Sequence, residues 1–302
     1  MIIDCHAHIV EHLSGTGARG EVRPIGSGKV RFLDGGEQIV IPKQYGDQEF
    51  LAETLIELMD EAGIDKAVLL QGLFYGLQNE YIYECVRKYP NRFVGAGSFD
   101  PYIEQAEEIL ERLIKHYRFK ILKFELSTGF GLSGLHGELK IDGKEFERVF
   151  LTAAKEETVV VLDIGERGMK SYQIDEIIKA AKLHPNVKIV LCHLLAVNGE
   201  DIDLWKDDMK CLGKCDNIWF DITAVPWNVK EAYPFAMSMD LINEAKKIIG
   251  SQRMMWGSDV PQLLVMEEYR KLYNFLFLDD RFSESEIDDL LYKSATNVYG
   301  IK

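Results

Sequence analysis

The chain has 302 residues, a formal net charge of −14 and no cluster of lysine and arginine, which excludes nucleic acid as an expected partner. The length suits either two domains or one α/β barrel, a fold that typically takes about 250 residues. No apolar run approaches the ~20 residues of a membrane span, and the first residues lack a signal-peptide pattern. The five cysteines include no Cys-x-x-Cys pair, as is typical of a reducing compartment, so we expect a cytoplasmic protein.

The chain begins MIIDCHAHIV, where Ile2 and Ile3 are typical of a buried strand. Side chains alternate between the two faces of a strand, so His6 and His8 are expected to point the same way, with Asp4 on that face. Two neutral imidazoles directed at one point suit a divalent metal. A pair of surface histidines at a strand end is the alternative, and this stretch alone does not decide between them.

Two glycine-rich segments interrupt the pattern of strands and helices that follows. Residues 11–47 contain eight glycines and no helical period, and they are far longer than a usual connection in a barrel. Within them, VRFLDGGEQIVI alternates around Asp34-Gly35-Gly36, which predicts a β-hairpin. We expect this insertion to act as a lid over the site, with a plain surface hairpin as the alternative. The second segment, 127–142, follows the fourth predicted strand.

Apolar strand-like runs alternate with amphipathic helical runs along the whole chain. The helical pattern is clear in 49–62, which Gly63 ends, and in 103–117. The strand-like runs are 2–8, 66–71, 93–98, 119–125, 158–163, 187–192, 217–222 and 253–258. Apolar strands that alternate with helices indicate a parallel sheet covered by helices. We predict a (β/α)8 barrel in which residues 1–302 form a single domain. No Gly-x-Gly-x-x-Gly follows a strand, which argues against a dinucleotide-binding sheet.

Six of these runs end in polar residues able to do chemistry. They are His6 and His8, Lys123 and Glu125, Asp163, His193, Asp221 and Asp259. The active sites of barrels are formed at the C-terminal ends of the strands. Each residue alone has an ordinary explanation, such as a helix cap. Together they predict a ring of imidazole and carboxylate groups on one rim.

The motifs DCHAH, CHL, WGSDVP and the closing KSATNVYGI resemble the amidohydrolase superfamily, and in particular its amidohydrolase-2 branch. That branch contains decarboxylases of aromatic and muconate-type acids and lactone hydrolases. The resemblance covers nearly the whole chain and implies a metal-dependent TIM barrel. It implies that His6, His8 and Asp259 bind a divalent metal, usually zinc, and that His193 orients or polarises the substrate. It is also compatible with a homodimer.

One position departs from the family pattern. Metal-binding members of this branch usually have a histidine in an H-x-G pattern at the end of the fifth strand, where this chain has Asp163 in VVVLDIGERG. Three interpretations stay open. Asp163 coordinates zinc or manganese itself, or Glu125 completes the ligand set, or the site is metal-free, as in some lactone-hydrolysing relatives.

We expect hydrolysis of a small, carboxylated molecule by a metal-activated water, whose proton Asp259 takes while His193 polarises the carbonyl. Arg167 is a candidate clamp for the substrate carboxylate, with a solvated loop charge as its alternative. His136 and Trp227 are candidate pocket walls, or ordinary packing residues. The rival functions are non-oxidative decarboxylation, in which Asp259 protonates carbon, a metal-free lactonase, and a catalytically inactive binding barrel.

Overall fold

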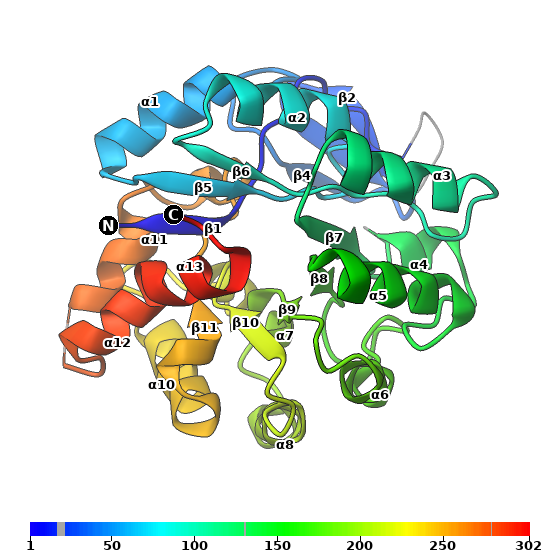
Figure 1. Cartoon of the computed structure of the whole chain (residues 1–302). Coiled ribbons are helices and arrows are strands. Elements are labelled where there is room, and N and C mark those ends of the chain that lie inside the picture. The colour runs from blue at the N-terminus through cyan, green and yellow to red at the C-terminus, as the bar shows by residue number, and fades with distance from the viewer. Residues whose placement is uncertain (17–21, 130, 279) are drawn as a thin grey trace.

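In the part of the chain that the computed structural model describes, residues 1–16, 22–129, 131–278 and 280–302, eight parallel strands form a ring surrounded by helices (Figure 1). These strands are β1 (Ile3–Ala7), β5 (Lys66–Leu69), β6 (Phe93–Gly95), β7 (Ile121–Glu125), β8 (Val159–Asp163), β9 (Ile189–Leu191), β10 (Ile218–Asp221) and β11 (Met254–Met255). They pair in the orders β1-β5-β6 and β7-β8-β9-β10-β11. The backbone N–H of Gly97 donates to Ile121 O at 2.9 Å and that of Cys5 to Trp256 O at 3.1 Å, which closes the ring. The predicted (β/α)8 barrel is confirmed.

Helices cover the outside of the ring, as the apolar periodicity predicts. The longer ones are α1 (Ala52–Ala62), α2 (Asn79–Lys88), α5 (Lys144–Glu156), α6 (Ile174–Leu183), α8 (Ile202–Leu212) and α10 (Ala236–Ile249). The shorter ones are α3 (Ala106–Glu111), α4 (Leu132–Leu135), α7 (His193–Ala196), α9 (Val225–Asn228), α11 (Lys271–Asn274), α12 (Glu284–Asp288) and α13 (Ser294–Tyr299). The described residues also include π-helical turns, η1 (Arg112–His116) and η5 (Asp289–Lys293). They include 3₁₀ turns as well, η2 (Ser251–Arg253), η3 (Gln262–Val265) and η4 (Phe275–Phe277). None of the helices in these described ranges has the length and apolar content of a membrane span.

The helix predicted over 49–62 illustrates why these runs fold as they do. Its Leu55 and Met59 are buried on one face, and Gly63 ends it with a φ of 76°, which a glycine adopts without steric cost. The predicted helix over 103–117 is present as α3 continued by the π-helical turn η1.

The apolar core is divided by the strands into an inner and an outer part. The inner part, inside the ring, contains strand residues such as Ile3, Cys5 and Val161. Residues at the end of the chain, including Val298 and Ile301, join the same inner cluster. Burying a side chain of this size contributes about 1.5–3 kcal/mol, so the last residues help to stabilise the barrel.

β1 departs from regular alternation just before the two histidines. Between Asp4 and Ala7, β1 has one residue more than the segment of β5 with which it pairs. Such a bulge changes the side of the sheet to which the following side chains point. Asp4 therefore faces the outer core, where the Tyr269 hydroxyl donates to its Oδ2 at 2.5 Å. The prediction that Asp4 shares a face with His6 and His8 is wrong.

The insertion after β1 contains a small antiparallel sheet formed by β2 (Val22–Gly26), β3 (Lys29–Phe32) and β4 (Glu37–Ile39). The predicted hairpin is present, because β3 and β4 pair in antiparallel fashion and Gly35 turns between them with a φ of 91°. β2 was not predicted. It contains Pro24, which interrupts a strand pattern and is tolerated because β2 lies at the edge of this sheet. Residues 17–21 of the insertion and residue 130 of segment 127–142 lie outside the described residues.

Candidate active site

A cavity of about 250 Å³ is bordered by residues from the C-terminal ends of the strands and from the loops that follow them. Strand-end residues that line it are His6, His8, Lys123, Glu125, Asp163, His193 and Asp259. The insertion contributes Phe32, Gln38 and Val40, so its described part forms one side of the wall. The predicted pocket residue Trp227 also lines the cavity.

His6, His8 and Asp259 meet in this cavity although they come from opposite ends of the chain. The Nε2 atom of His8 lies 3.0 Å from Asp259 Oδ1, and the Nε2 atom of His6 lies 3.7 Å from the same oxygen. The backbone supports this arrangement, because the N–H of Asp259 donates to His6 O at 2.8 Å. One ligand atom from each residue lies within 4.8 Å of the others, which is the arrangement of a three-ligand metal site.

The second ring nitrogen of each histidine fixes which atom is free to coordinate. His8 Nδ1 lies 2.9 Å from Leu70 O, and His6 Nδ1 lies 3.0 Å from Asp221 Oδ2. A carbonyl and a carboxylate only accept hydrogen bonds, so both Nδ1 atoms carry the hydrogen. In the neutral rings, the Nε2 lone pairs then face a carboxylate oxygen, and a cation between them removes this repulsion. Burial lowers the pKa of His6, which favours the neutral form that coordinates metals. The donor set fits a divalent cation.

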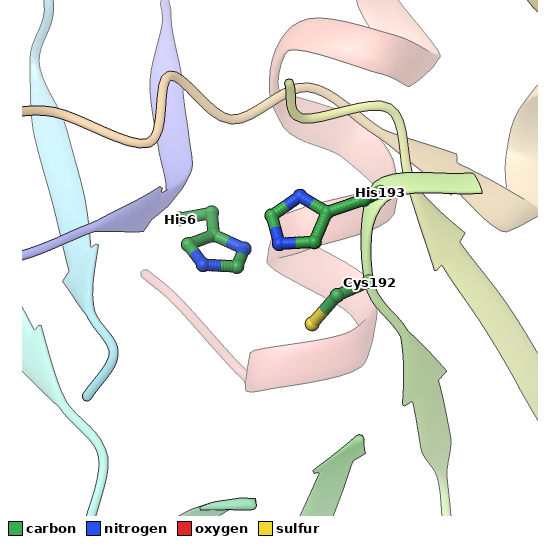
Figure 2. Close-up of side chains that lie close together, drawn as sticks. All are labelled: His6, Cys192 and His193. Atoms are coloured by element: carbon green, nitrogen blue, oxygen red, sulfur yellow. The ribbon is translucent and has the colours of Figure 1, made fainter. Parts of the chain in front are cut away.

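A second group of possible ligands contains His6, Cys192 and His193, with donor atoms within 4.8 Å of one another. Figure 2 shows the two imidazoles beside each other, His6 from β1 and His193 from the end of β9, with the Cys192 sulfur near them. Burial and the negative charge of Asp221 raise the pKa of the Cys192 thiol well above its usual value. A protonated thiol is a poor ligand, so the group with Asp259 fits a metal better.

Asp221 links the two histidines shown in Figure 2. Its Oδ2 accepts from His6 Nδ1, while its Oδ1 accepts from the backbone N–H of His193 at 2.7 Å and from that of Thr223 at 3.2 Å. Burial alone raises the pKa of Asp221, but its interactions with His6, including the Nδ1–H hydrogen bond, and the positive charge of His193 outweigh this and lower the pKa to about 2. Asp221 is therefore an anion that orients both histidines.

The ring of His193 lies between two acceptors. Its Nε2 is 3.1 Å from Asp163 Oδ2 and its Nδ1 is 3.2 Å from Thr223 O. Both nitrogens therefore donate, and the ring is an imidazolium. Burial lowers the pKa of His193, but the carboxylate of Asp163 outweighs this and raises the pKa to about 10. Burial raises the pKa of Asp163 in turn, yet the charge of His193 brings it well below its usual value.

Lys123 and Glu125 form a buried ion pair on β7. Lys123 Nζ lies 2.9 Å from Glu125 Oε2, and the Ser127 hydroxyl donates to Glu125 Oε1 at 2.5 Å. Burial and the nearby Asp163 raise the pKa of Glu125, although Lys123 opposes this. Both Glu125 oxygens thus have partners within the chain, and neither Glu125 nor Asp163 belongs to the group formed by His6, His8 and Asp259.

The backbone is strained at two of these residues. Asp259 has a φ of 60° and His193 a φ of 58°, and the left-handed conformation continues through Leu194, Leu195 and Ala196. Residues other than glycine adopt this conformation at a cost of about 1–2 kcal/mol each. Such strain is characteristic of functional sites.

Two predicted site residues lie outside this cavity. Arg167 pairs with Asp208, its guanidinium lies over the ring of Tyr172, and it lines a separate hollow. His136 Nε2 lies 2.7 Å from Asp100 Oδ2, and the imidazole ring of His136 stacks on the ring of Tyr102. Both side chains have charged and aromatic partners, and the charged ones are distant in sequence, which single-sequence patterns do not reveal.

Several lining residues were not predicted. Phe74 lies in the loop after β5, Asn228 is the last residue of α9 after β10, and Gln262 is the first residue of η3 after β11. Gln262 follows the WGSDVP motif closely, and this proximity is the one signal that could have indicated it. Lys123 and Asp221 were noticed as strand-end residues but received no role, because their partners depend on tertiary structure.

The chain forms a ring of parallel strands with imidazole and carboxylate groups at its C-terminal rim. Barrel enzymes form their active sites at this rim. The family model described as amidohydrolase (Amidohydro_2) matches residues 3–301, and the chain belongs to this family. Members of the family are hydrolases or carboxy-lyases. A search of curated proteins found no match.

Solved structures with a similar fold share little sequence with this chain. An amidohydrolase from Burkholderia multivorans has TM-scores of 0.76 with bound HEPES and 0.75 with bound zinc, at 16% and 17% identity, with both chains fully covered. A probable 2-pyrone-4,6-dicarboxylic acid hydrolase from Acinetobacter baumannii, with citric acid bound, has a TM-score of 0.69 at 17% identity over 99% of each chain. The 2,6-dihydroxybenzoate decarboxylase from Rhizobium has a TM-score of 0.58 at 15% identity and covers 83% of this chain and 88% of its own.

Proposed function

We propose that this protein is a hydrolase that adds water to the carbonyl carbon of a small molecule and breaks a C–O or C–N bond. The observation that carries the proposal is the approach of the His6 and His8 Nε2 atoms to Asp259 Oδ1, at 3.7 and 3.0 Å. Membership of a family of hydrolases and carboxy-lyases supports it.

His6, His8 and Asp259 would hold a divalent metal, for which zinc is the first candidate and manganese the second. Three protein ligands with an open position are typical of catalytic zinc sites. When bound, such an ion supplies a water of lowered pKa and polarises a carbonyl. The amidohydrolase from Burkholderia multivorans was solved with zinc, which supports this choice.

Asp259 is the general base of this proposal. Although burial raises the pKa of Asp259, its contact with His8 and the positive charge of His193 lower that pKa below the usual value. The carboxylate is therefore ionised at neutral pH, in the form that takes a proton from water and later returns it to the leaving group.

His193 supplies positive charge beside the reacting carbonyl. It is an imidazolium that lines the cavity and whose ring centre lies 4.8 Å from that of His6. A fixed cation at this place stabilises the negative charge that develops on the carbonyl oxygen. Phe32, Phe74 and Trp227 line the rest of the cavity, and their rings suit a small planar substrate.

The test begins with protein purified without chelators, in which metal content is measured by elemental analysis. A panel of lactones, cyclic amides and carboxylated aromatic acids is then scored for acid release against carbon dioxide release. We expect about one metal ion per chain and acid release from lactones or amides. Carbon dioxide release without ring opening would instead establish a decarboxylase, and full activity with substoichiometric metal would exclude the metal role.

Replacing Asp259 by asparagine tests its role as base. We expect Asp259→Asn to lower kcat by about two to four orders of magnitude, because general base catalysis contributes this much. Circular dichroism should show an unchanged fold. A variant with near-normal kcat would show that another group takes the proton.

A further inference from the structure

We propose that Asp163 is a positioning residue for His193 and does not belong to the metal ligand set. This inference rests on the proposed function, in which His193 stabilises developing negative charge. It assigns a role to the position at which the chain departs from the H-x-G pattern of its family.

Both carboxylate oxygens of Asp163 have partners within the chain. Oδ2 lies 3.1 Å from His193 Nε2, and Oδ1 accepts from the backbone N–H of Gly165 at 3.0 Å. The Gly165 contact fixes the rotation of the carboxylate, so that Oδ2 faces the imidazole. Asp163 therefore orients the His193 ring in the way that Asp221 orients the His6 ring.

The order of strands explains why Asp163 reaches His193. β8 lies between β7 and β9, and His193 comes two residues after the end of β9. The first and the fifth of eight strands stand on opposite sides of a ring, so β8 faces β1, which carries His6 and His8. Aspartate is shorter than histidine, and from this place it reaches the neighbouring strand end and not across the ring.

His193 needs such support because its backbone is unfavourable. Four consecutive residues, 193–196, have φ values of 58°, 48°, 63° and 49°. The backbone N–H of His193 is held by Asp221, and the ring is held by Asp163 and Thr223 O. Asp221 Oδ1 also lies 4.0 Å from His193 Nδ1, so a ring released by Asp163 has an alternative acceptor nearby.

The test uses the full-length variant Asp163→Asn, which keeps the shape and removes the charge. The chain offers a matched control in Glu147→Gln, since Glu147 Oε2 lies 3.1 Å from His184 Nε2 outside the cavity lining. Three quantities are measured for each: zinc bound per chain after dialysis, the imidazole N–H signals of metal-free protein by ¹⁵N–¹H NMR, and kcat and KM.

For Asp163→Asn we expect unchanged zinc binding, a shifted or rapidly exchanging Nε2–H signal of His193, and a kcat lowered about 10- to 100-fold with a nearly constant KM. The control should change none of these. Zinc affinity lowered tenfold or more with an unchanged His193 signal would overturn the proposal and make Asp163 a ligand.

Two further arms keep the proposal open to refutation. If Asp163→Asn fails to fold, Asp163→Glu is used instead, because it retains the charge. We expect Asp163→Glu to keep both the bound zinc and the hydrogen-bonded Nε2–H signal of His193. Loss of zinc from this variant would overturn the proposal. Should the wild-type protein hydrolyse nothing in the panel, the proposed function fails, while the NMR and zinc measurements still decide the role of Asp163.

Discussion

Single buried carboxylates set the states of two imidazoles in this site, His6 and His193. Asp221 fixes the tautomer of His6, and Asp163 keeps His193 protonated. The two rings lie with their centres 4.8 Å apart and yet carry different charges, because burial dominates at His6 and a carboxylate dominates at His193. One of them suits metal binding and the other suits charge stabilisation.

The raised pKa of His193 predicts a pH dependence of stability. In the folded protein, His193 has a pKa of about 10, whereas the ordinary pKa of a histidine is 6.5. The stabilisation is therefore fully present below pH 6.5 and is lost as the pH rises through 10. We expect the free energy of unfolding of metal-free protein, measured with urea, to fall between pH 7 and pH 9.5. The fall should be smaller in Asp163→Asn, and equal slopes in the two proteins would contradict the assignment.

Gly257 shows how closely the last strand approaches the first. A Cβ atom at this position would lie 2.5 Å from Thr223 Oγ1 and 2.6 Å from His6 Cβ. We expect Gly257→Ala to displace His6, to lower stability by about 1–3 kcal/mol and to weaken zinc binding. Gly137→Ala is the control, because nothing lies within 4 Å of a Cβ there. Urea unfolding and zinc titration measure both effects, and wild-type zinc affinity in Gly257→Ala would refute the expectation.

At the scale of elements, the left-handed turn after β9 places His193 in the cavity. The indole N–H of Trp205 donates to Leu194 O at 3.0 Å and holds the turn from α8. Leu194 and Leu195 are buried, so packing compensates for the strained backbone. The turn could not be predicted from the sequence, because His-Leu-Leu-Ala has no preference for left-handed φ angles.

A glycine substitution in this turn should behave differently from one in an ordinary helix. Ala196 has a φ of 49°, so Ala196→Gly removes strain and is expected to leave stability unchanged or to raise it by up to about 1 kcal/mol. Ala180→Gly within α6 should lower stability by about 1 kcal/mol. Urea unfolding compares the two, and an equal loss of stability in both would show that the turn is not strained.

At the scale of the molecule, the site exists because the barrel is closed. His6 and His8 lie at the end of the first strand and Asp259 follows the last, so they meet only when the segment after β11 lies beside β1. The end of the chain supports this closure from inside the ring, where Ile301 belongs to the same buried cluster as Ile3. Stability of the barrel and geometry of the site are therefore coupled.

Shortening the side chain of Ile301 should show how much the end of the chain stabilises the closed barrel. Ile301 is 5% exposed, and we expect Ile301→Ala to lower the free energy of unfolding by about 2–5 kcal/mol. Leu183→Ala is the control, since Leu183 is 61% exposed and should change stability by less than about 0.5 kcal/mol. Chemical denaturation measures both, and a loss below 1 kcal/mol for Ile301→Ala would contradict a role in closing the barrel.

The sequence by itself determined the barrel, the hairpin in the insertion and the strand-end positions of the polar residues. These follow from periods of two and 3.6 residues and from turn-forming residues, which are local properties of the chain. Only the tertiary structure decided which carboxylate faces which imidazole. Glu125, Asp163 and Asp221 carry the same chemistry at equivalent strand ends, and their partners depend on strand order and register. The bulge in β1 and the contacts that hold Arg167 and His136 outside the cavity are likewise set by neighbours distant in sequence.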